Sequence, residues 1–240
     1  MKKVAIIIPC FNEEEGIPAL QDALLPLQRE LQQQYELQWI FVDDGSTDKT
    51  FPLLQGLAKN LSSARVQRHE KNKNLGAALR TGLEASAAPD FVAYLDSDCT
   101  YDPRILLKLL PMLESGAMLV TASPYHPEGD VVGVPPWRLL LSKGLSLIYR
   151  LLTRSTLHTF TAMVRVQRFE SVIKTNSDRD DFTYITEVLL NHLRLGLRVE
   201  ELPATLSTRR FGFSKMKTMR TIFLHLELIK SYLLSGGVTR

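Results

Sequence analysis

Two aspartates separated by one residue, Asp96 and Asp98, are the best candidates in this sequence for holding a metal ion. They follow an apolar run that ends at Leu95. Carboxylates at the end of a strand can converge on a hard cation, and Mg²⁺ or Mn²⁺ prefers such oxygen ligands and often shares them with substrate phosphates. A loop with solvated aspartates before a helix near Pro103 is the alternative. The position of the pair at a predicted strand end favours the metal site.

Polar residues also follow two earlier apolar runs. One group is Asp43-Asp44-Gly45-Ser46-Thr47-Asp48. A carboxylate in this group can accept hydrogen bonds from a nucleobase or ribose, although its later residues also suit a helix N-cap. The other group is Pro9-Cys10-Phe11-Asn12-Glu13. It combines a fixed turn, an aromatic ring and a carboxylate, and its acidic residues also suit a helix N-terminus.

A basic segment near the C-terminus provides cations for an anionic ligand. Its guanidinium and ammonium groups match diphosphate oxygens, although a solvated basic loop is the alternative. The segment is Arg209-Arg210-Phe211-Gly212-Phe213-Ser214-Lys215. Neither the segment Lys73 to Ala78 nor any other has the G-x-G-x-x-G or Walker spacing, which argues against dinucleotide binding and P-loop hydrolysis. The five histidines have no metal-binding spacing, and there is no Ser/His/Asp or Cys/His arrangement.

The elements that must position these residues alternate between strand and helix. Strands are predicted where short apolar runs end at polar residues, and helices where apolar residues recur every three or four positions. Such alternation predicts an α/β fold with a doubly wound, mostly parallel sheet, in which ligands bind at the carboxyl ends of strands. The predicted strands are 4–8, 39–42, 65–68, 91–95, 118–122 and 198–206. The predicted helices are 17–34, 48–60, 74–85, 105–113, 182–195 and an amphipathic C-terminal helix, 218–234.

Composition fits one globular domain, residues 1–240, in which the pattern changes after about residue 125. The net charge of +3 is too small to suggest nucleic-acid binding, and two cysteines indicate a cytoplasmic protein without a disulfide framework. No apolar run is long enough to cross a bilayer, and residues 126–136 are predicted to be a loop. The apolar, basic stretch 137–153 and the C-terminal helix suit the cytoplasmic face of a membrane, but also a core or a dimer interface.

Taken together and in this order, the quoted segments resemble glycosyltransferase family 2, which has the GT-A fold. The resemblance extends from Val4 to about Met216 and is greatest to the polyprenyl-phosphate hexose synthases of the dolichol-phosphate mannose synthase group. It also rests on Asn74-Leu75-Gly76-Ala77-Ala78. The resemblance implies a metal-dependent enzyme that uses a nucleoside-diphosphate sugar and acts on a lipid-phosphate acceptor. It also implies that residues 1–125 bind the nucleotide sugar and that residues 126–240 form the acceptor side.

The resemblance also implies roles for matching positions. Asp96 and Asp98 would hold Mg²⁺ or Mn²⁺, with Ser97 against the nucleotide, and Arg209 and Lys215 would close over the diphosphate. An acceptor phosphate would meet Arg138 and Ser142. The nucleoside pocket would be lined by Pro9, Phe11, Glu13, Val42 and Asp44.

Three positions depart from the family pattern. Thr100, beside the nucleotide, stands where a glutamine often follows the metal motif. Pro124 replaces an arginine that often binds phosphate, and Thr159 replaces an aspartate. Because of these departures, transfer to a hydroxyl of a glycan, lipid or small molecule stays open beside transfer to a polyprenyl phosphate, as does sugar-nucleotide binding without catalysis.

The implied reaction is a single displacement that inverts the anomeric carbon. A phosphate acceptor is already an anion and needs no strong base, whereas a hydroxyl acceptor would need one, for which Asp181 and Glu187 are the candidates. The sequence leaves the base and sugar of the donor open, with GDP-mannose and UDP-glucose both suitable, and it leaves the oligomeric state open.

Overall fold

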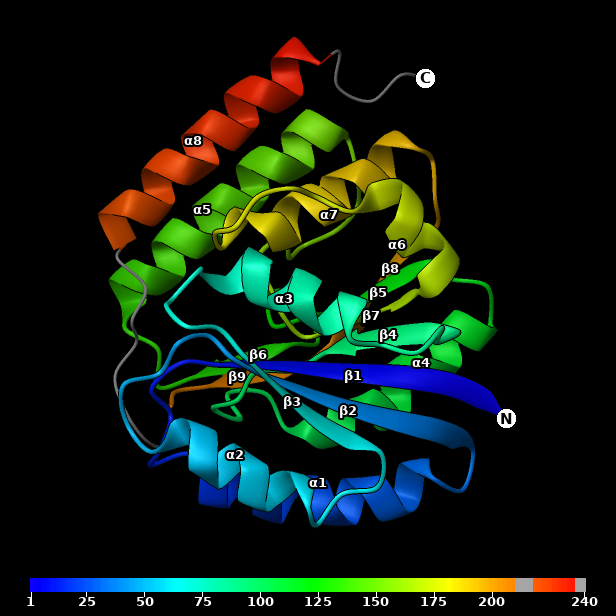
Figure 1. Cartoon of the computed structure of the whole chain (residues 1–240). Coiled ribbons are helices and arrows are strands. Elements are labelled where there is room, and N and C mark those ends of the chain that lie inside the picture. Colours follow the sequence, from blue (N-terminus) through cyan, green and yellow to red (C-terminus); the bar gives the residue numbers. More distant parts are fainter. Residues whose placement is uncertain (210–217, 236–240) are drawn as a thin grey trace.

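The structure is a computed structural model that describes residues 1–209 and 218–235 (Figure 1). Its helices and strands alternate through the first half of the chain, as the apolar pattern predicts. In chain order the elements are β1 (Lys2–Cys10), α1 (Ile17–Leu31), β2 (Tyr35–Asp43), α2 (Thr50–Ala58), β3 (Ala64–Arg68), α3 (Leu75–Glu84), β4 (Phe91–Tyr94), the 3₁₀ turn η1 (Pro103–Ile105), α4 (Leu106–Glu114), β5 (Leu119–Ser123), β6 (Asp130–Val132), α5 (Pro136–Thr153), β7 (Arg165–Arg168), α6 (Phe169–Thr175), α7 (Thr183–Arg194), β8 (Val199–Pro203), β9 (Thr205–Ser207) and α8 (Thr218–Leu234).

The main sheet has seven strands in the order β3-β2-β1-β4-β7-β5-β8. β7 is antiparallel to both of its neighbours, and the other adjacent pairs are parallel. This is the mostly parallel α/β sheet that the sequence predicts. Because β1, β2, β4, β5 and β8 run in the same direction, the residues that follow them lie along one edge, where doubly wound folds bind ligands.

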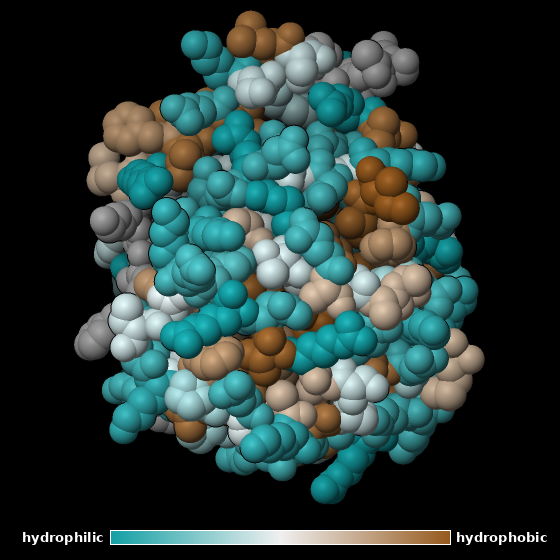
Figure 2. Space-filling view, viewed as in Figure 1, coloured by the Kyte–Doolittle hydropathy of each residue, from teal (hydrophilic) through white to brown (hydrophobic). Residues whose placement is uncertain are grey.

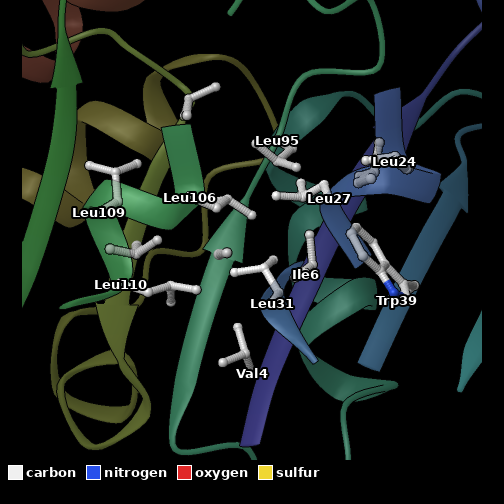
Figure 3. Packing of buried hydrophobic residues seen from close by; sticks show 14 of the residues in the cluster. Val4, Ile6, Leu24, Leu27, Leu31, Trp39, Leu95, Leu106, Leu109 and Leu110 are labelled. Carbon is white, nitrogen blue, oxygen red and sulfur yellow. The ribbon is translucent and has the colours of Figure 1, made fainter. Parts of the chain in front are cut away.

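Helices cover both faces of the sheet. The central strand β1 is buried from Val4 to Ile8, as expected for a strand between two helical layers. On one face α1, α2 and α4 pack against the sheet, and α1 does so through apolar residues spaced three or four apart. Figure 3 shows Leu27 and Leu31 of α1 close to Ile6, and Leu24 near Trp39 of β2.

On the opposite face α3 and α7 lie on the sheet, and α5 and α8 form an outer layer (Figure 1). The two outer helices lie side by side, and the Tyr149 hydroxyl on α5 is 3.0 Å from Nδ1 of His225 on α8. The helix α8 contacts the rest of the protein through His225, Leu228 and Tyr232, which are buried. Most of the apolar stripe expected from the sequence faces outward, with Met219, Phe223, Leu226 and Leu233 all exposed.

Other differences from the sequence prediction come from pairing between distant segments. The predicted loop 126–136 contains β6, which pairs with β9. The single strand predicted for 198–206 is therefore two strands, because β8 pairs with β5 and the chain then leaves the sheet at Ala204. The pair β7 and α6 was not predicted. The first helix ends at Leu31 instead of residue 34, and the second begins at Thr50 instead of residue 48.

Candidate active site at the carboxyl edge of the sheet

Three predicted segments lie at neighbouring strand ends. β1 pairs with β2 on one side and β4 on the other, so the segments that follow these strands meet at one edge. These are the segments of Glu13, of Asp44 and of Asp96. The fold therefore brings together residues that are more than 80 positions apart in the sequence, as Glu13 and Asp96 are.

The carboxylate of Asp44 is buried and held by two donors. Its Oδ1 atom accepts a hydrogen bond of 2.8 Å from the Lys73 backbone N–H and lies 2.7 Å from Nδ1 of His69. The other imidazole nitrogen is 2.9 Å from the Thr81 hydroxyl. Burial raises the pKa of Asp44, and the hydrogen bonds from His69 and Lys73 oppose that rise. These contacts hold the Asp44 side chain in place at the carboxyl edge of the sheet.

Sequence reasoning missed His69. The residue comes directly after β3, so it follows a strand end as Asp44 does, and that position was the available signal. Gly45, which follows Asp44, lies against the segment after β3. Its φ is +72°, and a Cβ there would lie 2.4 Å from the Lys71 backbone carbon. A side chain at this position would push the two segments apart.

The segment after β1 is tied to the segment after β2 by several hydrogen bonds. The Asn12 N–H donates to the Ser46 hydroxyl at 2.9 Å, and the Asn12 side-chain oxygen accepts from the Thr47 N–H at 2.8 Å. The Glu13 N–H donates to the Thr50 hydroxyl at 2.7 Å. This bracing buries Glu13, while Pro9 and Phe11 remain half-buried beside it and Val42 is fully buried beneath α3.

Asp96, Ser97 and Asp98 lie together after β4. Ser97 is buried and hydrogen-bonded to the Cys10 thiol, and the Asp98 Oδ1 atom accepts from the Thr100 N–H at 3.0 Å. Burial raises the pKa of Asp96, and the nearby Asp98 and Glu13 carboxylates raise it further, while Arg209 lowers it. Several carboxylates therefore share a space with too little positive charge to balance them.

Arg209 bridges two of these carboxylates. Its Nη1 atom donates to Glu13 Oε1 at 2.9 Å, and its Nε atom lies 2.6 Å from Asp98 Oδ2. A residue from the far end of the sequence thus reaches the strand-end cluster, as the basic segment suggested. Lys215, its predicted companion, lies outside the described residues.

The donor set suits Mg²⁺ or Mn²⁺. Asp96 and Asp98 present hard oxygen atoms, and a divalent cation would offset the repulsion between the two neighbouring carboxylates. In the described parts of the chain, 1–209 and 218–235, no group of three or more His, Cys, Asp or Glu side chains has metal-binding geometry. Mg²⁺ is often bound by one or two carboxylates and completes its coordination with phosphate oxygens and water, so Asp96 and Asp98 are a suitable donor pair.

On the acceptor side, the edge cluster connects to α5 through tyrosines. Burial, followed by the charges of Asp96 and Tyr125, raises the pKa of Tyr101 well above its usual value. Tyr125 in turn is hydrogen-bonded to Ser142. The Ser142 hydroxyl is 3.5 Å from that of Thr161.

Arg138 stands near the start of α5. Its guanidinium carbon is 5.2 Å from the centre of the Trp137 ring. Its Nε atom is buried and makes no hydrogen bond within the described residues. A buried guanidinium N–H without an acceptor is costly, so this group is suited to an anion.

The two base candidates have other partners. Glu187 accepts from Ser177 and forms an ion pair of 3.3 Å with Arg179. Asp181 accepts from the Thr183 N–H at 2.7 Å at the start of α7. Both carboxylates therefore hold the segment between α6 and α7 in place.

Comparison with known proteins identifies the family. The model of the family described as glycosyl transferase family 2 matches residues 5–175. This chain belongs to glycosyltransferase family 2. Its similarity is to the polyprenyl-phosphate mannose synthase group, as the motifs indicated.

Two relatives illustrate the similarity of this family 2 member. It is 29% identical over 221 residues to the polyprenol monophosphomannose synthase of Mycolicibacterium smegmatis, a match that covers 90% of this chain and 81% of that protein. It is 30% identical over 237 residues to the dolichol-phosphate mannosyltransferase of Pyrococcus furiosus, covering 95% of this chain and 62% of that longer protein.

Solved structures support the GT-A fold. Glucosyl-3-phosphoglycerate synthase from Mycobacterium tuberculosis, in complex with Mn²⁺, UDP and phosphoglyceric acid, superposes with a TM-score of 0.70 at 20% identity. The match covers 100% of this chain and 80% of that one. A structure of the same enzyme with Mg²⁺ and UDP gives a TM-score of 0.67. At this identity the likeness establishes the fold alone.

Proposed function

We propose that this protein transfers a hexose, with inversion, from a nucleoside-diphosphate sugar to a polyprenyl phosphate, using Mg²⁺ or Mn²⁺. The observation that carries the proposal is the cluster of Asp96, Asp98 and Glu13 at the end of neighbouring strands, with the Arg209 guanidinium between two of the carboxylates. Carboxylates for a metal and a cation for a diphosphate are the two requirements for stabilising a departing nucleoside diphosphate.

Each proposed ligand group has its own residues. Pro9, Phe11, Glu13, Val42 and Asp44 would form the nucleoside side, where Asp44 is the buried acceptor for a base or ribose. Ser97 and Thr100 would lie beside the nucleotide. Residues 1–125 would thus bind the donor and 126–240 the acceptor, within one domain.

In the reaction, the metal held by Asp96 and Asp98 would supply positive charge to the diphosphate. Arg209 binds Glu13 and Asp98 in this structure, and the same guanidinium is suited to phosphate oxygens once a divalent cation balances the carboxylates. With Lys215 from the segment outside the described residues, it would hold the leaving group. An acceptor phosphate is an anion at neutral pH, so no side chain has to remove a proton from it.

The acceptor phosphate would bind Arg138 and Ser142. The buried, unpaired Nε atom of Arg138 is the physical reason for assigning it an anion. The relatives named as polyprenol and dolichol-phosphate transferases support a polyprenyl chain as the lipid part. Such a lipid requires the protein to reach a membrane surface, and we propose that it does so from the cytoplasmic side.

Apolar side chains on the outer helices suit that surface. In Figure 2 brown and tan atoms gather at the upper left, where Figure 1 places α8 and α5. Within the described residues, no helix is both long and apolar enough to span a membrane. We name this surface the α5–α8 apolar face; it comprises Trp137, Leu140, Leu141, Leu147, Ile148 and Leu151 of α5 and Met219, Phe223, Leu226, Leu233 and Leu234 of α8.

Thermal unfolding with donor nucleotides tests the proposal. The protein is heated with GDP-mannose or UDP-glucose at about 100 times Kd, with Mn²⁺, Mg²⁺ or EDTA. One donor should stabilise the native state by about 2.7 kcal/mol, a shift in Tm on the order of 5–10 °C, and EDTA should remove it.

The variant Asp96→Asn should remain folded, lose the metal-dependent shift and lose transfer to undecaprenyl phosphate. Asp102→Asn is the matched control, because Asp102 caps η1 by accepting from the Arg104 N–H and asparagine caps equally well. Donor binding by the unmodified protein in EDTA, or by Asp96→Asn with Mn²⁺, that equals binding by the unmodified protein with Mn²⁺ would exclude the metal site.

A further inference from the structure

A second polar cluster lies farther along the same edge of the sheet and takes no part in the proposed metal or phosphate contacts. It surrounds Glu201 of β8, whose side chain is only 7% exposed. The carboxylate pairs across the strands with Ser123, the last residue of β5, whose hydroxyl donates to Glu201 Oε1 at 3.0 Å. A buried carboxylate persists only where donors surround it.

Glu201 holds one histidine by both backbone and ring. The His158 and Thr159 backbone N–H groups each donate to Glu201 Oε1 at 2.7 Å. The His158 ring nitrogen Nδ1 is 2.9 Å from Glu201 Oε2. Since the carboxylate only accepts, Nδ1 carries the proton, and in the neutral ring Nε2 presents a lone pair. Nε2 forms no hydrogen bond within the described residues.

A second imidazole presents the opposite polarity. His126 lies edge-on to His158, with ring centres 5.3 Å apart and planes at 74°. Its Nδ1 atom accepts from the Glu128 N–H at 3.2 Å, so the proton of the neutral ring is on Nε2. One ring of the pair therefore accepts through Nε2 and the other donates through Nε2. A hydroxyl group, which donates one hydrogen bond and accepts others, matches both.

The position of the His126–His158 pair relative to the metal ligands suits the hydroxyl groups of a hexose attached to the diphosphate. In the sheet, only β7 separates β4, which precedes Asp96, from β5, which ends at Ser123. Two strand spacings are about 10 Å. After β5 the chain passes through Tyr125, which is next to His126, and the charges of Tyr125 and Asp96 both raise the pKa of Tyr101. A sugar joined to a metal-bound diphosphate bridges such a span.

We propose that His126 and His158 form a hydroxyl-binding subsite for the transferred hexose, with Glu201 as the residue that positions His158. The inference rests on the proposed function, because a polyprenyl phosphate offers a phosphate whereas the hexose carries several hydroxyls. The subsite binds the sugar part of the donor and makes no contact with the nucleoside part.

Two substitutions separate the binding nitrogen from the positioning contact. In His158→Asn the amide nitrogen replaces Nδ1, so the bond to Glu201 is kept and the outward nitrogen is lost. In His158→Gln the amide reaches the place of Nε2. Glu201→Gln weakens the positioning, and Glu200→Gln is its control because Glu200 points to the opposite face and pairs with Arg198.

Calorimetry with matched ligands then isolates the sugar contact. Affinities are measured for UDP-glucose and UDP, and for GDP-mannose and GDP, in the presence of Mn²⁺. His158→Asn should weaken binding of the preferred nucleotide sugar by about tenfold, the loss of one hydrogen bond of about 1.4 kcal/mol, and leave binding of the nucleotide alone unchanged. His158→Gln should lose less, Glu201→Gln should resemble His158→Asn, and Glu200→Gln should match the unmodified protein.

A His158→Asn variant that binds nucleotide sugar as the unmodified protein does would overturn the subsite. So would an equal loss for the nucleotide and the nucleotide sugar. Failure of the proposed function gives a different result, because the unmodified protein would then bind none of the four ligands. Melting curves of each variant establish that it is folded.

Discussion

At the scale of single residues, charge compensation determines the site. Asp44 is buried, and its acceptor role depends on two donors from the loop between β3 and α3, His69 and the Lys73 backbone. The position of Asp44 after a strand was enough to select it from the sequence. Its partner His69 was not selected, because a histidine's function depends on the group its ring meets, and here that group is 25 residues away.

A double-mutant cycle tests this pair. Asp44→Asn and His69→Gln should each lower the free energy of unfolding by about 1–3 kcal/mol, since each leaves a buried polar group without its partner. Together they should cost less than the sum, with a coupling of about 1–2 kcal/mol. Urea unfolding of the four proteins measures this, and additive losses would show that the two side chains do not interact in solution.

Arg209 illustrates the limit of sequence reasoning at this scale. A basic segment close to the C-terminus predicts an anionic partner, but its contacts with Glu13 and Asp98 depend on folding of the whole chain. Because Arg209 is engaged with carboxylates, it provides positive charge for the cluster before any ligand binds. Metal binding and phosphate binding are therefore expected to support each other.

At the scale of elements, apolar spacing predicted the helices and parallel strands whose partners lie nearby in the sequence. It missed β7, which inserts antiparallel between β4 and β5, because its four residues have no local pattern that distinguishes them from a loop. It also joined β8 and β9, since only pairing with β5 and β6 separates them. Nonlocal pairing decides short strands.

The close approach of α3 to the segment before α7 makes a prediction at this scale. A Cβ on Gly76 would lie 2.1 Å from the Arg179 carbonyl oxygen and 2.9 Å from the Tyr184 Cβ atom. The Gly76 N–H also donates to the Asp180 carbonyl at 2.6 Å. Gly76→Ala should therefore destabilise the protein by about 1–3 kcal/mol, because backbone must move to admit a methyl group.

Gly56→Ala is the matched control for that substitution. Gly56 lies inside α2, and a Cβ there would meet nothing within 4 Å. Alanine should stabilise this helix by about 0.5–1 kcal/mol through its higher helix propensity. Differential scanning calorimetry should give Tm changes of opposite sign for the two variants. Equal changes would mean that α3 does not pack as closely as described.

At the scale of the whole molecule, the arrangement of the outer helices could not be read from the sequence. The spacing of apolar residues marked 218–234 as amphipathic but did not show which face packs inward. In the structure the inward face is formed by His225, Leu228 and Tyr232. The apolar residues on the other side of the helix therefore remain exposed; they are Met219, Phe223, Leu226 and Leu233. Together with exposed apolar residues of α5 they form the α5–α8 apolar face, and a contiguous exposed apolar surface is typical of an interaction site.

We expect the α5–α8 apolar face to attach the protein to membranes. Four exposed basic residues accompany it, Lys143, Arg154, Arg220 and Lys230, so anionic lipids should strengthen binding and salt should weaken it. The double variant Leu140→Ser with Phe223→Ser should lower the partition onto phosphatidylcholine vesicles containing phosphatidylglycerol by at least about tenfold, since each side chain contributes roughly 1.5–3 kcal/mol when buried.

Ile173→Ser is the control, because Ile173 on α6 and Leu140 are equally exposed, at 73%. Sedimentation with vesicles measures bound protein, and transfer to a water-soluble short-chain acceptor phosphate should be unchanged in both variants. If Ile173→Ser reduces binding as much as the double variant does, the face is not the attachment surface, and the exposed helices have another partner.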